Sequence, residues 1–135
     1  EMDGEFGGRG IPEPGGFAAL DPLAGSKADA SPGGNTTIGV VATNADLTPA
    51  DARRIAIMAQ DGLARAIRPV HAPVDGDTIF VLATGAYELG HEARHGPLSA
   101  LGAMAADCVA RAVARAVYEA GTLGAAMSYR DRHKI

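Results

Sequence analysis

Apolar positions along the chain form two strand patterns that alternate with two helical patterns. Residues 36–43 and 77–85 are β-branched runs with apolar side chains on both faces, which predicts two strands of one sheet, each buried on both sides. Between them, Thr48 suits a helix N-cap and Pro49 the first helical position, and this helix should run to about Ile67. Strand, helix, strand and helix together predict an α/β layered fold.

A longer helical pattern follows, from Pro97 to about Ala120, and Gly121 suits its C-terminal cap. Small apolar residues recur on one arc of this helix and charged residues on the opposite arc. Cys108 lies on the apolar arc, which predicts a buried small hydrophobe and not a nucleophile. The charged residues 130–134 are typical of a solvated tail.

The first part of the chain has a different composition. Glycine and proline are concentrated in residues 1–34, which hold few large apolar residues, so we expect a mobile segment that adds little to a core. The composition changes at Asn35, which divides the chain into residues 1–35 and a folding unit of residues 36–135. The chain begins with Glu1 and not with Met, and we expect it to be a piece of a longer gene product.

Charge and composition narrow the classes of function. The formal net charge is -4 and the basic residues are scattered, which argues against nucleic acid and anionic membranes as partners. A single cysteine excludes an internal disulfide. The sequence has no apolar run long enough to cross a bilayer and no basic start before an apolar stretch, so we expect a cytoplasmic protein.

The junction at residues 31–36 carries a candidate nucleophile. A hydroxyl is a weak nucleophile until a base removes its proton, and a terminal Thr can use its own α-amine, whose reference pKa is about 7.7 to 8.0. Thr36 stands at the start of a strand, so its hydroxyl could attack the Asn35 carbonyl, and hydrolysis of the resulting ester would free the terminus. The same Gly-Gly-Asn-Thr pattern also occurs in ordinary loops that enter strands.

Longer strings resemble the P1 peptidase family, which includes the DmpA aminopeptidase, the β-peptidyl aminopeptidases and nylon-oligomer hydrolases of the NylC type. The resemblance covers residues 36–135, and residues 1–12 look like the end of a preceding α subunit. Aminopeptidase members mostly carry Ser at the nucleophile position, so Thr36 favours the nylon-oligomer branch. The strings that carry the resemblance are residues 35–45 (NTTIGVVATNA), 59–69 (AQDGLARAIRP), 75–78 (DGDT) and 83–85 (ATG).

The resemblance implies a four-layer αββα sandwich of the N-terminal-nucleophile hydrolase type, of which this chain supplies part. One precursor would cut itself between Asn35 and Thr36 into a larger α and a smaller β subunit, with residues 1–35 as the α-subunit tail. Asp75 and Asp77 match the acidic pair beside the family's threonine, whereas its site lysine and asparagine belong to the α subunit. We expect a homo-oligomer of αβ units, and neither a cofactor nor a metal.

On this hypothesis the enzyme hydrolyses 6-aminohexanoate (nylon-6) oligomers or related small amides through an acyl-enzyme on Thr36. The alternative within the family is an aminopeptidase or β-peptidyl aminopeptidase. Two other classes stay open. His91, Glu92 and His95 match the H-E-x-x-H motif of zinc peptidases, although the flanking Gly and Pro residues argue against a stable helix there. The last alternative is a non-catalytic assembly subunit.

Overall fold

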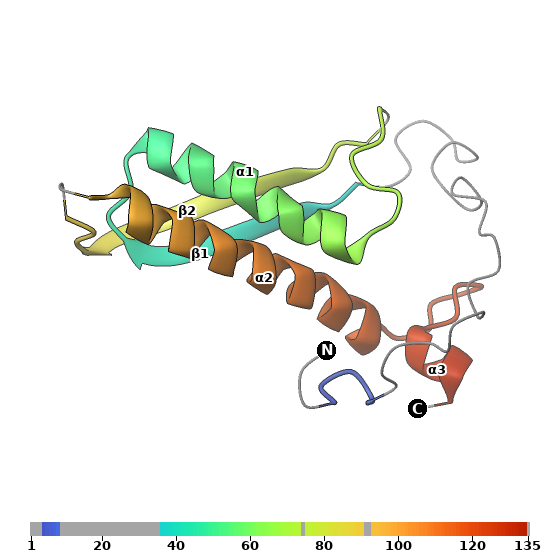
Figure 1. The fold of residues 1–135 in the computed structure, drawn as a ribbon. Coiled ribbons are helices and arrows are strands. Elements are labelled where there is room, and N and C mark those ends of the chain that lie inside the picture. Colours follow the sequence, from blue (N-terminus) through green and yellow to red (C-terminus); the bar gives the residue numbers. More distant parts are fainter. Residues whose placement is uncertain (1–3, 9–35, 74, 91–92, 135) are drawn as a thin grey trace, which may run out of the picture.

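A computed structural model describes residues 4–8, 36–73, 75–90 and 93–134 of the chain. Its elements follow one another in the order strand, helix, strand, helix, short helix (Figure 1). They are β1 (Ile38–Ala45), α1 (Pro49–Ala66), β2 (Thr78–Tyr87), α2 (His95–Glu119) and α3 (Tyr129–His133). The predicted α/β arrangement is confirmed, with β1 starting two residues later and β2 ending two residues later than the sequence pattern indicated.

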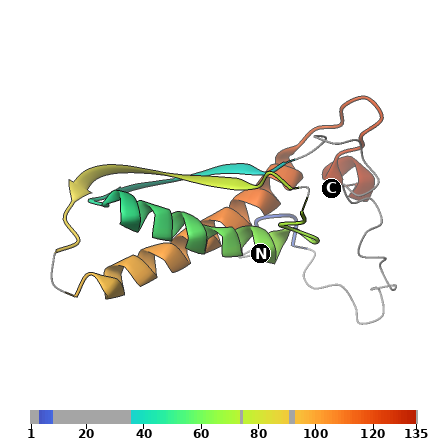
Figure 2. The ribbon, with the colours of Figure 1, turned by 90° about the horizontal axis from the view of Figure 1, so that it is seen from above.

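The two strands pair in parallel, with Ile38 opposite Thr78 and a register shift between Thr43 and Ala45. Both long helices lie on the same side of this sheet, as Figure 2 shows. The described residues thus form one sheet layer and one helix layer. The second sheet and the second helix layer of the expected sandwich stay a prediction.

The open face of the sheet corrects the prediction that both strands are buried on both sides. Ile38, Val40, Phe80 and Leu82 project from this face and are between 55% and 67% exposed. Side chains of the opposite face, including that of Ile79, pack against the helices. Apolar residues on both faces indicate that both faces can be covered, but the described part of this chain covers only one.

The helix α1 supplies the centre of the core. Its first turn is capped by side chains on both sides of the helix start. The Thr48 hydroxyl accepts a hydrogen bond from the Asp51 N–H, and the Asp51 carboxylate accepts one from the Thr48 N–H, which forms a capping box. Further along α1, Ile55, Ala59 and Leu63 are fully buried between β2 and α2. The predicted N-cap and first helical position are confirmed.

The helices α1 and α2 approach each other closely at two glycines. A side chain at Gly62 would collide with the Ala106 carbonyl oxygen, and one at Gly102 would collide with Met58. This approach turns the buried face of α2 toward Gly102 and Ala106. Cys108, predicted to be buried, is therefore exposed, because it lies to the side of the contact.

The ends of α2 also differ from the prediction. The helix begins at His95, because Gly96 and Pro97 are accommodated in its first turn, where a missing backbone N–H breaks no helical hydrogen bond. Beyond α2, residues expected to be a solvated tail form α3, whose first turn is capped by the hydroxyl of the buried Ser128. Tyr129 of α3 lies 6.4 Å from Tyr118 of α2, measured between ring centroids, so α3 packs back on the molecule.

Candidate active site

Thr36 lies at the amino end of the sheet, two residues before β1 begins. Because β1 and β2 are parallel, both strands start at this same edge, and the residues that lead into β2 lie beside Thr36. One of them is Gly76: a Cβ atom added there would lie 2.8 Å from the Thr36 hydroxyl oxygen. The predicted nucleophile therefore lies against the glycine that separates the two predicted acids.

The residue after Thr36 is held on two sides. The Thr37 N–H donates a hydrogen bond of 3.0 Å to Asp77 Oδ1, and the Thr37 carbonyl accepts one of 2.9 Å from the Thr78 N–H. Both partners belong to the segment that enters β2. This pairing sets the direction in which the chain leaves Thr36.

The carboxylate of Asp77 is buried and accepts hydrogen bonds from several donors. Its side chain is only 5% exposed, and its Oδ2 atom lies 3.3 Å from His71 Nδ1 and 3.4 Å from the His71 N–H. His71 itself adopts a left-handed conformation with φ of 56°, a strained geometry for a non-glycine residue that often accompanies functional sites. The loop after α1 thus places the imidazole of His71 beside the carboxylate of Asp77.

Sequence reasoning missed His71. It sits six residues before Asp77, in a short loop that contains Pro69 and Pro73 and has no strand or helix periodicity. The one available signal was a histidine close to an acidic pair, and this signal is weak because a loop histidine is usually exposed. Here its side chain is 41% exposed and still within ion-pair distance of Asp77.

Asp75 closes the loop before the site. Its N–H donates to the Ala72 carbonyl, and its Oδ2 atom accepts a hydrogen bond of 2.8 Å from the Ala72 N–H. These contacts fix the turn that brings Gly76 onto Thr36. The structure therefore groups Thr36, Asp75 and Asp77 at one edge, while Asn35, the other predicted cleavage-site residue, lies outside the described residues.

The H-E-x-x-H motif falls largely outside the described part of the chain, since His91 and Glu92 are not among its residues. His95 begins α2. Within residues 4–8, 36–73, 75–90 and 93–134, we find no group of three His, Cys, Asp or Glu side chains that could hold a metal ion. Arg94, inside the motif, is bound to Asp46 and Asp51 in a network that joins α1 to α2.

A comparison with protein families decides the relationship. The sequence profile described as Peptidase family S58 matches residues 13–130 of this chain. The chain belongs to this family. The resemblance drawn from the sequence strings is thereby confirmed.

Two groups of family S58 relatives differ in their names. An uncharacterized aminopeptidase of Mycobacterium tuberculosis is 48% identical over 97% of this chain, and the match spans 40% of that relative. An uncharacterized aminopeptidase of Mycobacterium leprae is 50% identical over 70% of the chain and 28% of its own length. A 6-aminohexanoate-oligomer endohydrolase of Paenarthrobacter ureafaciens is 35% identical over 62% of the chain and 25% of its own length.

The chain therefore spans less than half the length of these curated S58 relatives. Among the described residues, the helices are too short or too polar to cross a membrane.

Proposed function

We propose that this chain is part of an amide hydrolase that cleaves itself between Asn35 and Thr36 and then uses Thr36 as its nucleophile. The proposal rests mainly on the position of the Thr36 hydroxyl. The Thr36 hydroxyl lies against Gly76, the residue that separates Asp75 from Asp77 in the sequence, at the edge where both parallel strands begin. A nucleophile at this edge sits on a rigid two-stranded support, which favours reproducible positioning.

Maturation would proceed in two steps. The Thr36 hydroxyl attacks the carbonyl carbon of Asn35, its proton passes to the departing nitrogen, and the amide becomes an ester. Water then hydrolyses this ester, which leaves a carboxylate on Asn35 and a free α-amine on Thr36. In each turnover, that α-amine accepts the hydroxyl proton as Thr36 attacks a substrate amide, and passes it to the departing amine as the C–N bond breaks. Water then hydrolyses the ester on Thr36, which releases the acyl group as a carboxylate and restores the hydroxyl.

In this proposal Asp77 is the residue that orients the nucleophile. Its buried carboxylate already holds the Thr37 N–H, one peptide away from Thr36, and faces the imidazole of His71. After cleavage, the same carboxylate is suited to accept a hydrogen bond from the new α-amine of Thr36. Asp75 acts indirectly, because its side chain holds the turn that carries Gly76.

The remainder of the precursor is the proposed partner. The sheet face formed by Ile38, Val40, Phe80 and Leu82 is apolar and is not covered by any of the described residues, which supports a second sheet packed on it. The relatives continue well beyond the matched region, so an α subunit of the same precursor is available to supply that sheet. The site lysine and asparagine, the assembly into αβ oligomers and a cytoplasmic location also belong to this proposal.

Two substrate branches are each favoured by a specific observation. Thr at position 36 favours hydrolysis of 6-aminohexanoate oligomers, which the name of the relative from Paenarthrobacter ureafaciens also states for that protein. The longer and closer match to the mycobacterial protein named an aminopeptidase favours peptides with free amino termini. We retain the oligomer hydrolase as the first candidate and the aminopeptidase as the second.

The test uses the full-length gene product that carries this chain, incubated with linear 6-aminohexanoate oligomers and with peptides that have free amino termini. Cleavage of internal amide bonds of the oligomers supports the first branch, and release of only the N-terminal residue supports the second. Either activity should vanish in Thr36→Ala and persist with a chelator. A folded, matured protein that cleaves neither substrate, or one that a chelator inactivates, contradicts the proposal.

A further inference from the structure

A short turn near the start of the chain packs against the far helix α2. In this N-terminal turn (residues 4–8), the Gly7 N–H donates a hydrogen bond of 3.0 Å to the Gly4 carbonyl. Gly4, Gly7 and Gly8 all have φ between 64° and 94°, which only glycine adopts without strain. The two residues inside the turn, Glu5 and Phe6, are the ones that contact α2.

Glu5 forms a two-pronged ion pair with Arg111 of α2. Arg111 Nη2 donates to Glu5 Oε2 at 2.6 Å, and Arg111 Nε donates to Oε1 at 3.2 Å. The Glu5 side chain is only 15% exposed, whereas that of Arg111 is 56% exposed. The hydrogen bond to Glu5 raises the pKa of Arg111, as expected for a guanidinium that faces a carboxylate.

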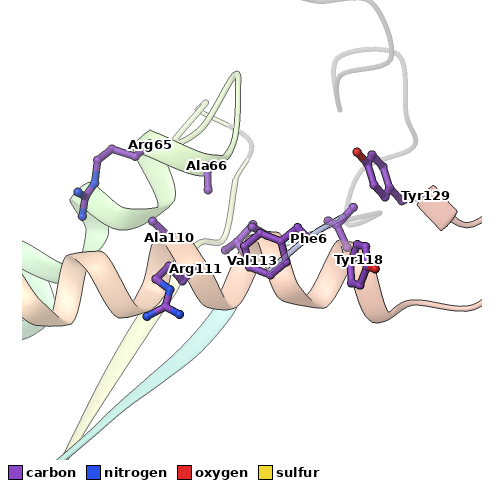
Figure 3. Close-up of a pocket in the computed structure, with 10 residues that line it drawn as sticks. Phe6, Arg65, Ala66, Ala110, Arg111, Val113, Tyr118 and Tyr129 are labelled. Carbon is purple, nitrogen blue, oxygen red and sulfur yellow. The ribbon is translucent and has the colours of Figure 1, made fainter. Parts of the chain in front are cut away.

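Phe6 lines the adjacent groove, a cavity of about 480 Å³ between the end of α1 and the second half of α2. Figure 3 shows its ring among side chains of α2, with Tyr118 next to it and Ala66 of α1 beyond. The ring centroids of Phe6 and Tyr118 are 6.0 Å apart, within the range of favourable aromatic pairs. Tyr118 is itself held by Tyr129 and by the guanidinium of Arg130.

We propose that the N-terminal turn is an anchor that keeps the segment before the cleavage point bound to α2 after the bond between Asn35 and Thr36 is cut. This inference rests on the proposed function, since only cleavage makes a non-covalent link necessary. The segment bound to α2 is thus part of this same chain. Its charged pair sets the register and its aromatic ring supplies buried apolar area.

The groove beside the anchor is also lined by the end of α1. Arg65 and Ala66, in the last turn of α1, form one wall of the groove, and the loop that follows them carries His71 to Asp77. The N-terminal turn and the end of α1 from which the site loop starts therefore line the same groove. After cleavage, the turn joins the two products at the same end of the molecule.

The test cuts the chain with an added protease, at a point between the N-terminal turn and Thr36. A recognition sequence for a site-specific protease replaces residues 20–26, and Thr36→Ala prevents any cleavage at Thr36. After protease treatment, native mass spectrometry and dilution during size-exclusion chromatography measure how much of the first piece stays bound to the second. We expect the two pieces of the otherwise unchanged chain to remain together.

Phe6→Ala and Arg111→Glu should each raise the dissociation constant of the two pieces by at least about tenfold. Adding Glu5→Arg to Arg111→Glu should restore part of the binding by reversing the ion pair. Arg115→Glu, a charge reversal on an exposed residue of the same helix, is the matched control and should leave binding unchanged. Phe6 and Glu5 lie outside the buried core, so variants at these positions keep the fold intact.

The anchor is refuted if the pieces of the parent chain separate, or if Phe6→Ala and Arg111→Glu bind as the Arg115→Glu control does. Because the protease makes the cut, these outcomes do not depend on Thr36. A wild-type chain that stays whole while the protease-cut pieces stay bound contradicts only the autocleavage proposal. Autocleavage followed by separation of the pieces contradicts only the anchor.

Discussion

The two ends of the β1–β2 pair both carry aspartates, but the partners of these acids differ in kind. At the amino end, Asp77 faces a backbone N–H of Thr37 and the imidazole of His71. At the carboxyl end, Asp46 and Asp51 face the guanidinium of Arg94, which is only 17% exposed. One end pairs its acid with a neutral backbone N–H and an imidazole, and the other pairs its acids with a permanent charge.

This difference separates two uses of a carboxylate. The Arg94 network joins the loop after β1, the start of α1 and the start of α2, since Arg94 also donates to the carbonyls of Gly90 and Asp46. Such a network serves stability, because each acid already has a fixed counter-charge. The amino end leaves Asp77 with neutral or titratable donors, which is the arrangement that proton transfer and hydrogen bonding to a nucleophile require.

The largest expected effect is at Asp77. Asp77→Asn keeps the size of the side chain but turns one acceptor atom into a donor that faces the His71 N–H. We expect the rate of cleavage between Asn35 and Thr36 to fall by about 100-fold or more, measured by intact mass against time. Asp51→Asn, the matched change at the other end, should leave that rate unchanged. Equal rates for Asp77→Asn and the wild type would remove Asp77 from the mechanism.

Gly76→Ala should have the next largest effect. The added methyl group would lie 2.8 Å from the Thr36 hydroxyl oxygen, so either the turn or the hydroxyl must shift. Such a displacement of a nucleophile should slow cleavage by about tenfold to a hundredfold, in the same mass assay. Gly96→Ala is the control at the other end, where a new Cβ has no neighbour within 4 Å. If both alanine variants are cleaved at the same rate, contact with Gly76 does not position Thr36.

Arg94→Ala should affect stability and not cleavage. Its removal leaves Asp46 and Asp51 without their guanidinium, and we expect the free energy of unfolding to fall by about 1–3 kcal/mol. Urea titration followed by circular dichroism measures this loss, and Arg94→Lys should lie between the two because it keeps the charge but loses the planar fork. Slow cleavage by folded Arg94→Ala protein would show that the two ends are not independent.

The smallest expected effect is a pH dependence at Asp51. The hydroxyl and the N–H of Thr48, followed by Arg94, hold the pKa of Asp51 below its ordinary value of 3.8. Because the unfolded chain binds this proton more tightly, the contribution of Asp51 to stability is present above about pH 3.8 and is lost as the pH falls through the lowered value. Asp51→Asn should flatten the urea midpoint against pH in this acidic range. An unchanged slope would exclude this coupling.

Local signals in the sequence predicted the elements well. Thr48, Pro49 and Asp51 carry the start of α1 in side chains that are adjacent in the sequence, so no distant information was needed. The strands were recognisable from β-branched runs alone. The strand order was not, because the pairing of two strands leaves no pattern within either strand.

The errors share one cause. Hydrophobic periodicity identifies the apolar face of an element, but it does not identify the residues that pack against that face. Cys108 was placed on the buried arc, yet the close approach at Gly62 turns α2 toward Ala106 instead. Phe6 was assigned to a segment that adds little to a core, yet it packs against Tyr118, far along the chain. His71 reaches Asp77 through a left-handed loop that no periodicity indicates. The roles of Thr36, Asp75 and Asp77 stay predictions.

The most direct measurement is the intact mass and N-terminal sequence of the full-length gene product, made beside Thr36→Ala and Thr36→Ser. We expect a fragment that begins Thr36-Thr37-Ile38 in the wild type, a similar fragment in Thr36→Ser and an uncut Thr36→Ala chain. Circular dichroism establishes that each protein is folded. A folded wild type that stays whole, or a Thr36→Ala variant cut at the same bond, would contradict the claim that Thr36 is the nucleophile.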